Sequence, residues 1–158
     1  MTLLFTLALL AQANGEWTTY SGNDLGHRYS PLNQINTSNV AKLKPAWIYQ
    51  VRRTDKFETT PIVKDGVMYI TEPPSNVTAL DLQTGRPIWQ YKRTYPEDLR
   101  LCCGQVNRGV AILGDLVYVG TVDAHLLALD ARTGQIRWDT KVEGYGTGHS
   151  LTAAPLIV

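Results

Sequence analysis

The segment Ala79-Leu-Asp-Leu-Gln-Thr-Gly-Arg-Pro-Ile-Trp89 recurs 49 residues later as Ala128-Leu-Asp-Ala-Arg-Thr-Gly-Gln-Ile-Arg-Trp138. Both segments have the pattern A-x-D-x-x-T-G-x-x-x-W. The similarity extends further, because Ile62–Trp89 aligns without gaps on Ala111–Trp138 with seven identities in 28 positions. Similarity at a fixed spacing indicates an internal repeat.

The spacing of the repeat predicts the fold class. A third copy begins near residue 152, where Ala154-Pro-Leu-Ile-Val158 resembles Thr60-Pro-Ile-Val63, so the first two repeats cover about 60–91 and about 109–140. A period of roughly 40–50 residues with four strands per unit is typical of a β-propeller blade, and propellers close with roughly 4–8 blades. We therefore predict an all-β chain that forms about two blades, with flanking strands, of a larger propeller.

Each repeat is predicted to form four short strands. Runs of β-branched and aromatic residues bounded by turn residues are typical of such strands, and Lys64-Asp65-Gly66 is the first turn of the first repeat. Its strands are predicted at about Thr60–Val63, Val67–Thr71, Val77–Leu80 and Ile88–Tyr91.

The residues of the shared motif are predicted to be architectural. Asp81 can accept hydrogen bonds from the amides of the turn between the third and fourth strands, and Gly85 supplies a positive φ there. Trp89 returns a large apolar ring to the same place in every unit, where it fills the gap between one sheet and the next. Such tryptophan docking motifs hold neighbouring blades together and carry no chemistry.

The residues before the first repeat are predicted to contain one strand and one short helix. Trp47, within Leu43–Tyr49, is expected in the last strand of another blade, whose earlier strands would come from beyond residue 158. Thr37–Lys42 is predicted to be a short helix capped by Thr37 or Ser38.

The composition excludes several classes of protein. Of the 158 residues, 44% are hydrophobic and 18% charged, which is typical of a globular chain. Lys and Arg number 15 against 14 Asp and Glu, and the basic residues are scattered, so no nucleic-acid partner is expected. The longest apolar stretch is too short to span a membrane.

Residues 1–13 are predicted to be a signal peptide. Leu3–Leu10 is an apolar run, and Ala11-Gln12-Ala13 has the small-x-small pattern of a cleavage site, which leaves residues 14–158 as the mature chain. No Lys or Arg precedes the run, so the alternatives are an ordinary hydrophobic strand or a start site placed too late.

The two cysteines, Cys102 and Cys103, are adjacent in sequence. They do not have the CxxC spacing of zinc sites or thioredoxin-like motifs, so they are either free thiols or a disulfide between neighbours. Adjacent Cα atoms lie about 3.8 Å apart, below the usual disulfide range of roughly 4.4–6.8 Å, so such a bridge closes a strained ring. For an arbitrary pair this favours free thiols.

Several segments resemble those of dehydrogenases that depend on pyrroloquinoline quinone (PQQ), the quinoprotein alcohol dehydrogenases. The resemblance extends from Trp17 to Val158, and its most specific part is a Cys-Cys pair followed five residues later by Arg-Gly within such a repeat. The matching segments are Trp17-Thr-Thr-Tyr-Ser-Gly-Asn-Asp24, Tyr29-Ser-Pro-Leu-Asn-Gln-Ile-Asn36, Phe57-Glu-Thr-Thr-Pro61, Cys102-Cys-Gly-Gln-Val-Asn-Arg-Gly109 and Leu151-Thr-Ala-Ala-Pro155.

The resemblance implies an eight-bladed ring whose axial cavity holds PQQ over a calcium ion. In this family two adjacent cysteines form a disulfide that packs flat on the quinone, and they match Cys102 and Cys103. A carboxylate and an arginine that contact the cofactor match Glu58 and Arg108. A threonine at the start of the third blade matches Thr152, which is expected to hydrogen-bond a cofactor carboxylate.

These assignments are chemically consistent with a planar tricarboxylic ortho-quinone. Arg108 offers a planar fork of donors that can stabilise negative charge on the quinone oxygens as they are reduced. Glu58 is expected to accept a hydrogen bond from a ring N–H, a protonated group or water. Gly104-Gln105 departs from the family, where an acidic and an apolar residue are more common, and this affects the loop beside the cofactor.

The complete catalytic site is not expected within this chain. The family's calcium ligands and its catalytic Asp, the general base toward the substrate hydroxyl, match no residue here and are expected beyond residue 158. No catalytic residue and no metal ligand is therefore assigned. His27, His125 and His149 lack metal-ligand spacing, and Gly144-Tyr-Gly-Thr-Gly148 is predicted to be a loop, not a nucleotide cradle.

The favoured function is the N-terminal part of a periplasmic PQQ-dependent dehydrogenase, inactive by itself, that oxidises small alcohols or related hydroxyl compounds. Its electrons would pass to a cytochrome c or another acceptor. The alternative is a non-catalytic propeller scaffold of the outer-membrane assembly type. Cys102-Cys103 together with Arg108 favours the enzyme, because a scaffold needs neither a strained disulfide nor a cation at its axis.

Overall fold

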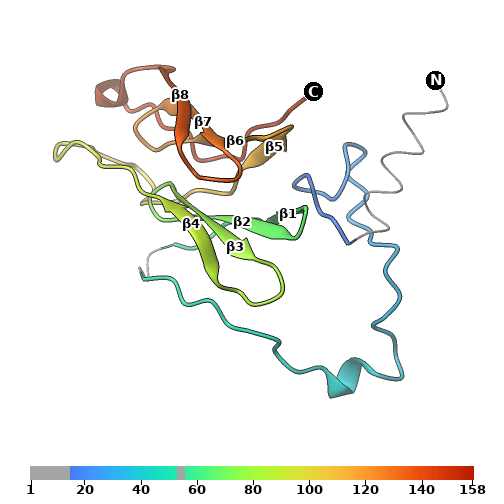
Figure 1. Cartoon of the computed structure of the whole chain (residues 1–158). Coiled ribbons are helices and arrows are strands. Elements are labelled where there is room, and N and C mark those ends of the chain that lie inside the picture. The colour runs from blue at the N-terminus through green and yellow to red at the C-terminus, as the bar shows by residue number, and fades with distance from the viewer. Residues whose placement is uncertain (1–14, 53–55) are drawn as a thin grey trace.

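The computed structural model describes residues 15–52 and 56–158, which form two four-stranded antiparallel sheets with their strands in chain order (Figure 1). The first sheet contains β1 (Ile62–Lys64), β2 (Val67–Glu72), β3 (Asn76–Asp81) and β4 (Pro87–Tyr91). The second contains β5 (Ala111–Leu113), β6 (Leu116–Gly120), β7 (His125–Asp130) and β8 (Ile136–Lys141). The predicted all-β class and the four strands of each repeat are confirmed.

One apolar core joins the two sheets. Strands β3 and β7 have runs of four buried residues, because both of their faces are covered. The last strand of the second sheet, β8, is instead exposed along its whole length. The core is made of side chains from both repeats: Ile62, Tyr69, Val77, Ala79, Val110, Val117, Val119, Leu127 and Leu129.

The turn before the last strand of each sheet has the predicted geometry. Asp81 Oδ1 accepts from the backbone N–H and the hydroxyl of Thr84, both at 2.7 Å. Asp130 does the same with Thr133, at 2.8 and 2.9 Å. Hydrogen bonds from Arg137 and then Thr133 lower the pKa of Asp130 to about 2. Each turn therefore contains an ionised carboxylate that organises the backbone.

A tryptophan from an earlier part of the chain packs on each of these turns. The indole N–H of Trp89, on β4, donates to the carbonyl of Ala131 at 2.9 Å, and its ring covers Gly134. Trp47 makes the equivalent contact with the first sheet, donating to Leu82 O at 3.0 Å. The indole rings lie where a side chain on the turn glycine would otherwise project.

Of two predictions for the segment before the first repeat, one is wrong in the length and cap of the helix, and the other stays a prediction. The predicted helix over Thr37–Lys42 is a single 3-10 turn, η1 (Val40–Lys42), preceded by Asn39 and without a side-chain cap. The Ser38 hydroxyl does not cap it; Ser38 lies one residue before Asn39, which occupies the cap position, and its hydroxyl donates to Asn36 Oδ1 at 2.6 Å. Within the described residues, Leu43–Tyr49 has no strand partner, and because its partners are expected beyond residue 158, its place in the last strand of another blade stays a prediction.

The predicted loop at residues 144–148 is present and contains a second 3-10 turn, η2 (Tyr145–Thr147). At the other end of the chain, Trp17 extends the first sheet, because it exchanges backbone hydrogen bonds of 2.9 and 2.8 Å with Val63. The predicted signal peptide, residues 1–13, lies outside the described residues. No helix of the described part of the chain is long and apolar enough to cross a membrane.

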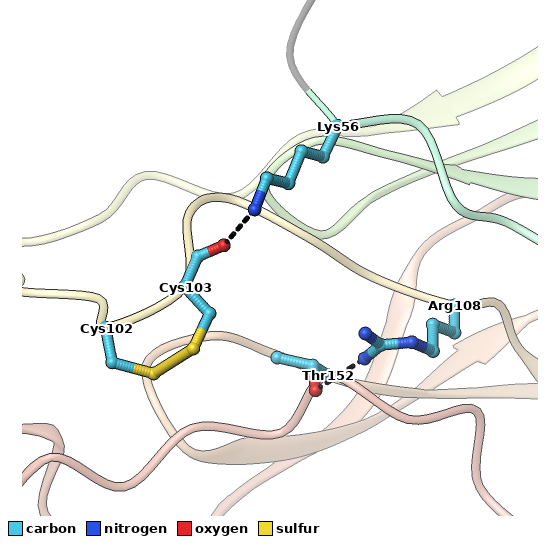
Figure 2. Close-up of a disulfide and its surroundings, with 5 residues drawn as sticks. All are labelled: Lys56, Cys102, Cys103, Arg108 and Thr152. Atoms are coloured by element: carbon cyan, nitrogen blue, oxygen red, sulfur yellow. Dashed lines mark hydrogen bonds between the residues drawn. A yellow bond between two sulfur atoms is a disulfide. The ribbon is translucent and has the colours of Figure 1, made fainter.

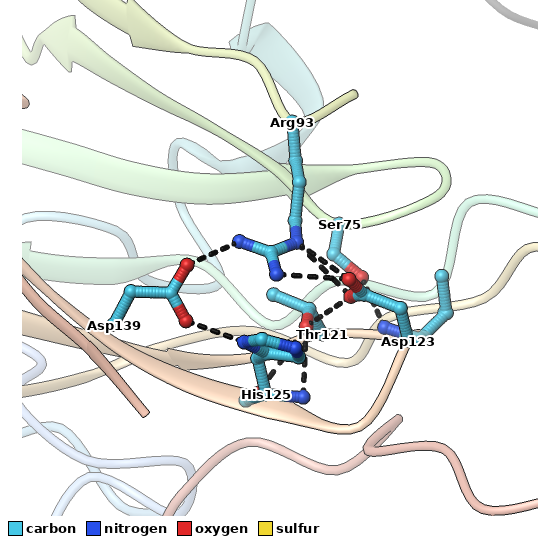
Figure 3. Close-up of polar contacts among 7 residues, drawn as sticks. Ser75, Arg93, Thr121, Asp123, His125 and Asp139 are labelled. Atoms are coloured by element: carbon cyan, nitrogen blue, oxygen red, sulfur yellow. Dashed lines mark hydrogen bonds and ion pairs between the residues drawn. The ribbon is translucent and has the colours of Figure 1, made fainter. Parts of the chain in front are cut away.

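The connection between the sheets, residues 92–110, carries Cys102 and Cys103, whose sulfur atoms form a disulfide (Figure 2). Arg93 anchors the start of this connection to the second sheet (Figure 3). Its guanidinium donates to both carboxylate oxygens of Asp123, at 2.8–3.0 Å, and to Asp139 at 2.9 Å. The connection is thus attached to the second sheet before it reaches the cysteines.

Charge compensation stabilises this anchor. Burial alone would lower the pKa of Arg93, but its hydrogen bonds with Asp123 and Asp139 raise it. For Asp139 the directions are reversed: burial alone would raise its pKa, but hydrogen bonds from Arg93 and His125 hold the pKa below its ordinary value. Asp139 is therefore ionised at neutral pH, and the ion pair is complete.

The close contact of Trp89 with Gly134 predicts a difference between two glycine substitutions. Both Gly134 and Gly66 have a positive φ, +71° and +75°, so alanine costs about 1 kcal/mol at either position. A Cβ at residue 134 would lie 2.5 Å from the Trp89 ring, whereas a Cβ at residue 66 meets open space. Gly134→Ala should therefore lower the free energy of unfolding by about 2 kcal/mol more than Gly66→Ala. Urea unfolding of the two variants measures this, and equal losses would contradict the docking contact.

The lowered pKa of Asp139 predicts a pH dependence. A carboxylate whose folded-state pKa lies below its unfolded value stabilises the fold above the unfolded value, about 3.9, and loses that contribution as the pH falls through the folded-state value. Wild type should therefore lose more stability than Asp139→Asn between pH 6 and about pH 3. Urea midpoints at the two pH values measure the difference, and parallel losses would show that the anchor does not depend on the charge of Asp139.

Candidate functional site

The site predicted from the sequence lies where the connection between the sheets meets the starts of the repeats. Asn107 fixes the end of this connection, because its buried side chain donates to Gly120 O at 2.7 Å and to Ser75 Oγ at 3.2 Å. Its Oδ1 accepts from the N–H of Gly109 at 3.0 Å. Asn107 therefore fixes the backbone position from which the side chain of Arg108 projects.

The backbone of Arg108 joins three successive repeats. Its N–H donates to Thr152 O at 2.9 Å, and its carbonyl accepts from the N–H of Thr60 at 3.1 Å. These two bonds fix the backbone of Arg108 relative to the segment before β1 and to the start of the third repeat. Gly109, which follows, would carry a Cβ only 3.0 Å from Thr60 O, so the close approach requires glycine.

The structure brings together three of the predicted cofactor residues. The Arg108 guanidinium pairs with Glu58, Nη2 to Oε2, at 3.0 Å, and its Nη1 donates to Thr152 Oγ1 at 3.0 Å. The side chains of Arg108 and Glu58 are 47% and 41% exposed, so the pair remains open to a ligand. Glu58 was expected to accept from a ring N–H, a protonated group or water, and in the structure it accepts from the guanidinium of Arg108.

The cysteine pair lies near these residues but does not contact them through a hydrogen bond. Figure 2 places the Cys102–Cys103 disulfide in the same region as Arg108 and Thr152. Both cysteines are exposed, and the Cα atoms are 3.8 Å apart. Gly104 follows with a φ of +90°, a conformation that turns the chain away from the disulfide.

Sequence reasoning missed two residues that shape the site. Lys56 donates from Nζ to the carbonyl of Cys103 at 2.9 Å, as Figure 2 shows. No motif marks a lysine in a loop 47 positions away, so no signal was available for it. Asn107 lies inside the cysteine motif quoted above, in the segment Val106-Asn-Arg-Gly-Val110. An amide side chain between apolar residues was a usable signal for a buried structural hydrogen-bonding group.

The histidines do not gather at this site. His125 contacts Asp139, His27 lies 3.2 Å from the Asn23 amide, and His149 lies 2.8 Å from the Thr147 hydroxyl. Within residues 15–52 and 56–158, no group of three or more His, Cys, Asp or Glu side chains is arranged to hold a metal ion. The described site provides cationic, carboxylate, hydroxyl and sulfur groups, from Lys56 and Arg108, Glu58, Thr152 and the disulfide.

Comparison with known proteins identifies the family. The family described as glucose/ethanol/alcohol dehydrogenase, PQQ β-propeller domain, matches residues 17–151. Quinoprotein alcohol dehydrogenase PedH of Pseudomonas putida is 45% identical over 135 residues, which are 84% of this chain and 23% of that protein.

Solved structures agree with this match. Quinohemoprotein alcohol dehydrogenase ADHIIG from Pseudomonas putida HK5 has a TM-score of 0.87 and 41% identity, over 97% of this chain and 23% of that one. A europium-containing methanol dehydrogenase has a TM-score of 0.83 and 35% identity, over 90% of this chain and 26% of that one. The chain spans about a quarter of the length of these relatives. Because the match covers most of its length, the chain belongs to the PQQ-dependent (quinoprotein) alcohol dehydrogenase family of oxidoreductases.

Proposed function

We propose that this chain is the N-terminal part of a periplasmic quinoprotein dehydrogenase that oxidises small alcohols with PQQ. The observation that carries the proposal is the meeting of Glu58, Arg108 and Thr152, which come from the starts of three successive repeats and lie beside a disulfide. The relatives reported above are dehydrogenases at 35–45% identity, whereas BamB from Moraxella catarrhalis matches at 20% identity with a TM-score of 0.58, which supports only a shared fold, so the comparisons favour the dehydrogenase over a non-catalytic scaffold.

The described residues fit PQQ, whose three carboxylates and ortho-quinone need cationic and polar donors at the rim and a flat surface on the ring. Arg108 uses one N–H on Glu58 and another on Thr152, and its guanidinium has further N–H groups for a carboxylate or quinone oxygen. The Thr152 hydroxyl accepts from Arg108 and can donate its own proton to a ligand carboxylate. The disulfide of Cys102 and Cys103 offers an uncharged sulfur surface for the ring.

Each residue then has a distinct role. When bound, PQQ supplies a two-electron acceptor for the hydride, or its equivalent, that an alcohol loses on oxidation. Arg108 binds the rim of the cofactor and stabilises negative charge that develops there. Glu58 holds the guanidinium plane in one orientation through the 3.0 Å ion pair. The disulfide covers one face and excludes water from it.

The remaining parts of the enzyme are assigned to residues beyond 158. They comprise the catalytic Asp, the ligands of a calcium ion and enough further blades to close an eight-bladed ring. Trp138 supports this arrangement, because it repeats the position of Trp89 and is 38% exposed on the outer strand β8. We expect it to dock on the Thr-Gly turn of the next blade, as Trp47 and Trp89 do on theirs.

Localisation and electron transfer follow from the same proposal. Residues 1–13 would direct export, and a disulfide persists in the oxidising periplasm. A cytochrome c is the proposed electron acceptor. One solved relative is a europium-containing enzyme, so the metal requirement is tested with calcium and with europium separately.

The role of Arg108 predicts a loss of cofactor affinity when its charge is removed. In the full-length protein, purified without cofactor and titrated with PQQ, Arg108→Met should weaken binding about tenfold, because a charged hydrogen-bond donor is lost. Arg86→Met is the matched control, since Arg86 lies in the turn before β4. Absorbance or fluorescence titration measures both affinities. Equal affinities in the two variants would remove Arg108 from the cofactor site.

The proposed assignment of the base and the metal ligands to residues beyond 158 predicts that residues 1–158 alone are inactive. This chain should not reduce an artificial electron acceptor in the presence of an alcohol, PQQ and either metal ion, because the proposed base and metal ligands are not part of it. Dye reduction that requires both PQQ and metal would contradict the assignment of these groups to residues beyond 158.

A further inference from the structure

A lysine that no motif marks contacts the backbone of the cysteine pair. Lys56 Nζ donates to the carbonyl oxygen of Cys103 at 2.9 Å (Figure 2). The ammonium group thus holds the peptide unit between Cys103 and Gly104, directly after the disulfide. A charged donor to a carbonyl forms a stronger hydrogen bond than a neutral one.

Gly104 allows this contact. A Cβ built at Gly104 would lie 3.7 Å from Cδ and from Cε of Lys56, so the stem of the lysine passes along the backbone of this residue. The φ of Gly104, +90°, is one that residues with side chains rarely adopt. The lysine and the glycine therefore act together on the conformation of the turn that follows the disulfide.

The segment that carries Lys56 also holds the arginine of the site. Glu58 pairs with the Arg108 guanidinium at 3.0 Å, and the N–H of Thr60 donates to the carbonyl of Arg108 at 3.1 Å. Residues 56, 58 and 60 of one short segment thus contact the disulfide turn at one end and Arg108 at the other. The spacing between these two parts of the site is set by this segment.

We propose that Lys56 is a positioning residue of the cofactor site, which fixes the Cys102–Cys103 disulfide relative to Arg108 through the Cys103 carbonyl. The inference rests on the proposed function, because the disulfide and the arginine are the groups assigned to PQQ. Without the ammonium group, the turn at Gly104 loses one long-range restraint. The sulfur surface is then no longer held in one orientation toward the cofactor.

The chain offers a matched control for this contact. Lys64 Nζ donates to the carbonyl of Gly114 at 2.9 Å, across 50 positions, and the residue is half-buried. Lys56 and Lys64 therefore make the same kind of bond, but only the Lys56 bond involves the disulfide turn. Lys56→Met and Lys64→Met each remove one such bond, and Lys56→Arg retains a cationic donor at the site.

The test uses the full-length protein without cofactor and has two readouts. The first is the dissociation constant for added PQQ, and the second is the rate at which dithiothreitol reduces the disulfide before cofactor is added, followed by alkylation and mass spectrometry. Lys56→Met should weaken PQQ binding and accelerate reduction, each about fivefold, as expected for the loss of one hydrogen bond. Lys56→Arg should remain within about twofold of wild type, and Lys64→Met should match wild type in both readouts.

The outcomes separate this inference from the proposed function. If wild type does not bind PQQ, the proposed function is wrong and the role of Lys56 in a cofactor site falls with it. If wild type binds PQQ and Lys56→Met behaves like Lys64→Met, the function stands and the positioning role of Lys56 is refuted. Should Lys56→Met fail to fold by circular dichroism, Lys56→Ala, which also lacks a side-chain donor, replaces it. Wild-type values for that variant would equally refute the role.

Discussion

The docking of the Trp89 indole on the turn at Gly134 is the contact on which the arrangement of the two sheets depends. The indole N–H satisfies the carbonyl of Ala131, and the ring occupies the space that any side chain at residue 134 would need. Tyr69 donates to the same carbonyl at 3.2 Å, so two aromatic residues of the first sheet converge on one peptide of the second. A hydrogen bond and a steric fit together define one relative position of neighbouring sheets, which apolar burial alone does not specify.

The site follows from that position, because its residues come from the starts of different repeats. Arg108 reaches Glu58 and Thr152 only if the first sheet, the second sheet and the start of the third repeat are in register. The connection that carries the cysteines is anchored at both ends, by Arg93 on Asp123 and by Asn107 on Gly120. The repeats thus provide a rigid frame, and the chemistry lies on segments between strands, where side chains are not needed for the core.

Those parts of the structure that repeat were predictable from the sequence. The turn at Gly85 and the ring at Trp89 recur at a constant spacing, and the local rules for positive φ and for carboxylate-organised turns apply to each copy. The helix predicted over Thr37–Lys42 is shortened to the 3-10 turn Val40–Lys42, which starts after Asn39 and not after Thr37 or Ser38. Lys56 was not predictable, since its partner is a backbone carbonyl that periodicity does not mark.

Resemblance, not periodicity, identified Glu58, Arg108 and Thr152, and their convergence in the structure is what makes a shared ligand chemically reasonable. The most direct test of this account is a crystal structure of the full-length protein with PQQ. The account predicts that the PQQ ring lies on the Cys102–Cys103 disulfide at van der Waals distance, about 3.5–4.0 Å, with Arg108 hydrogen-bonded to its rim. A cofactor bound elsewhere, or a ring that contacts neither the disulfide nor Arg108, would contradict it.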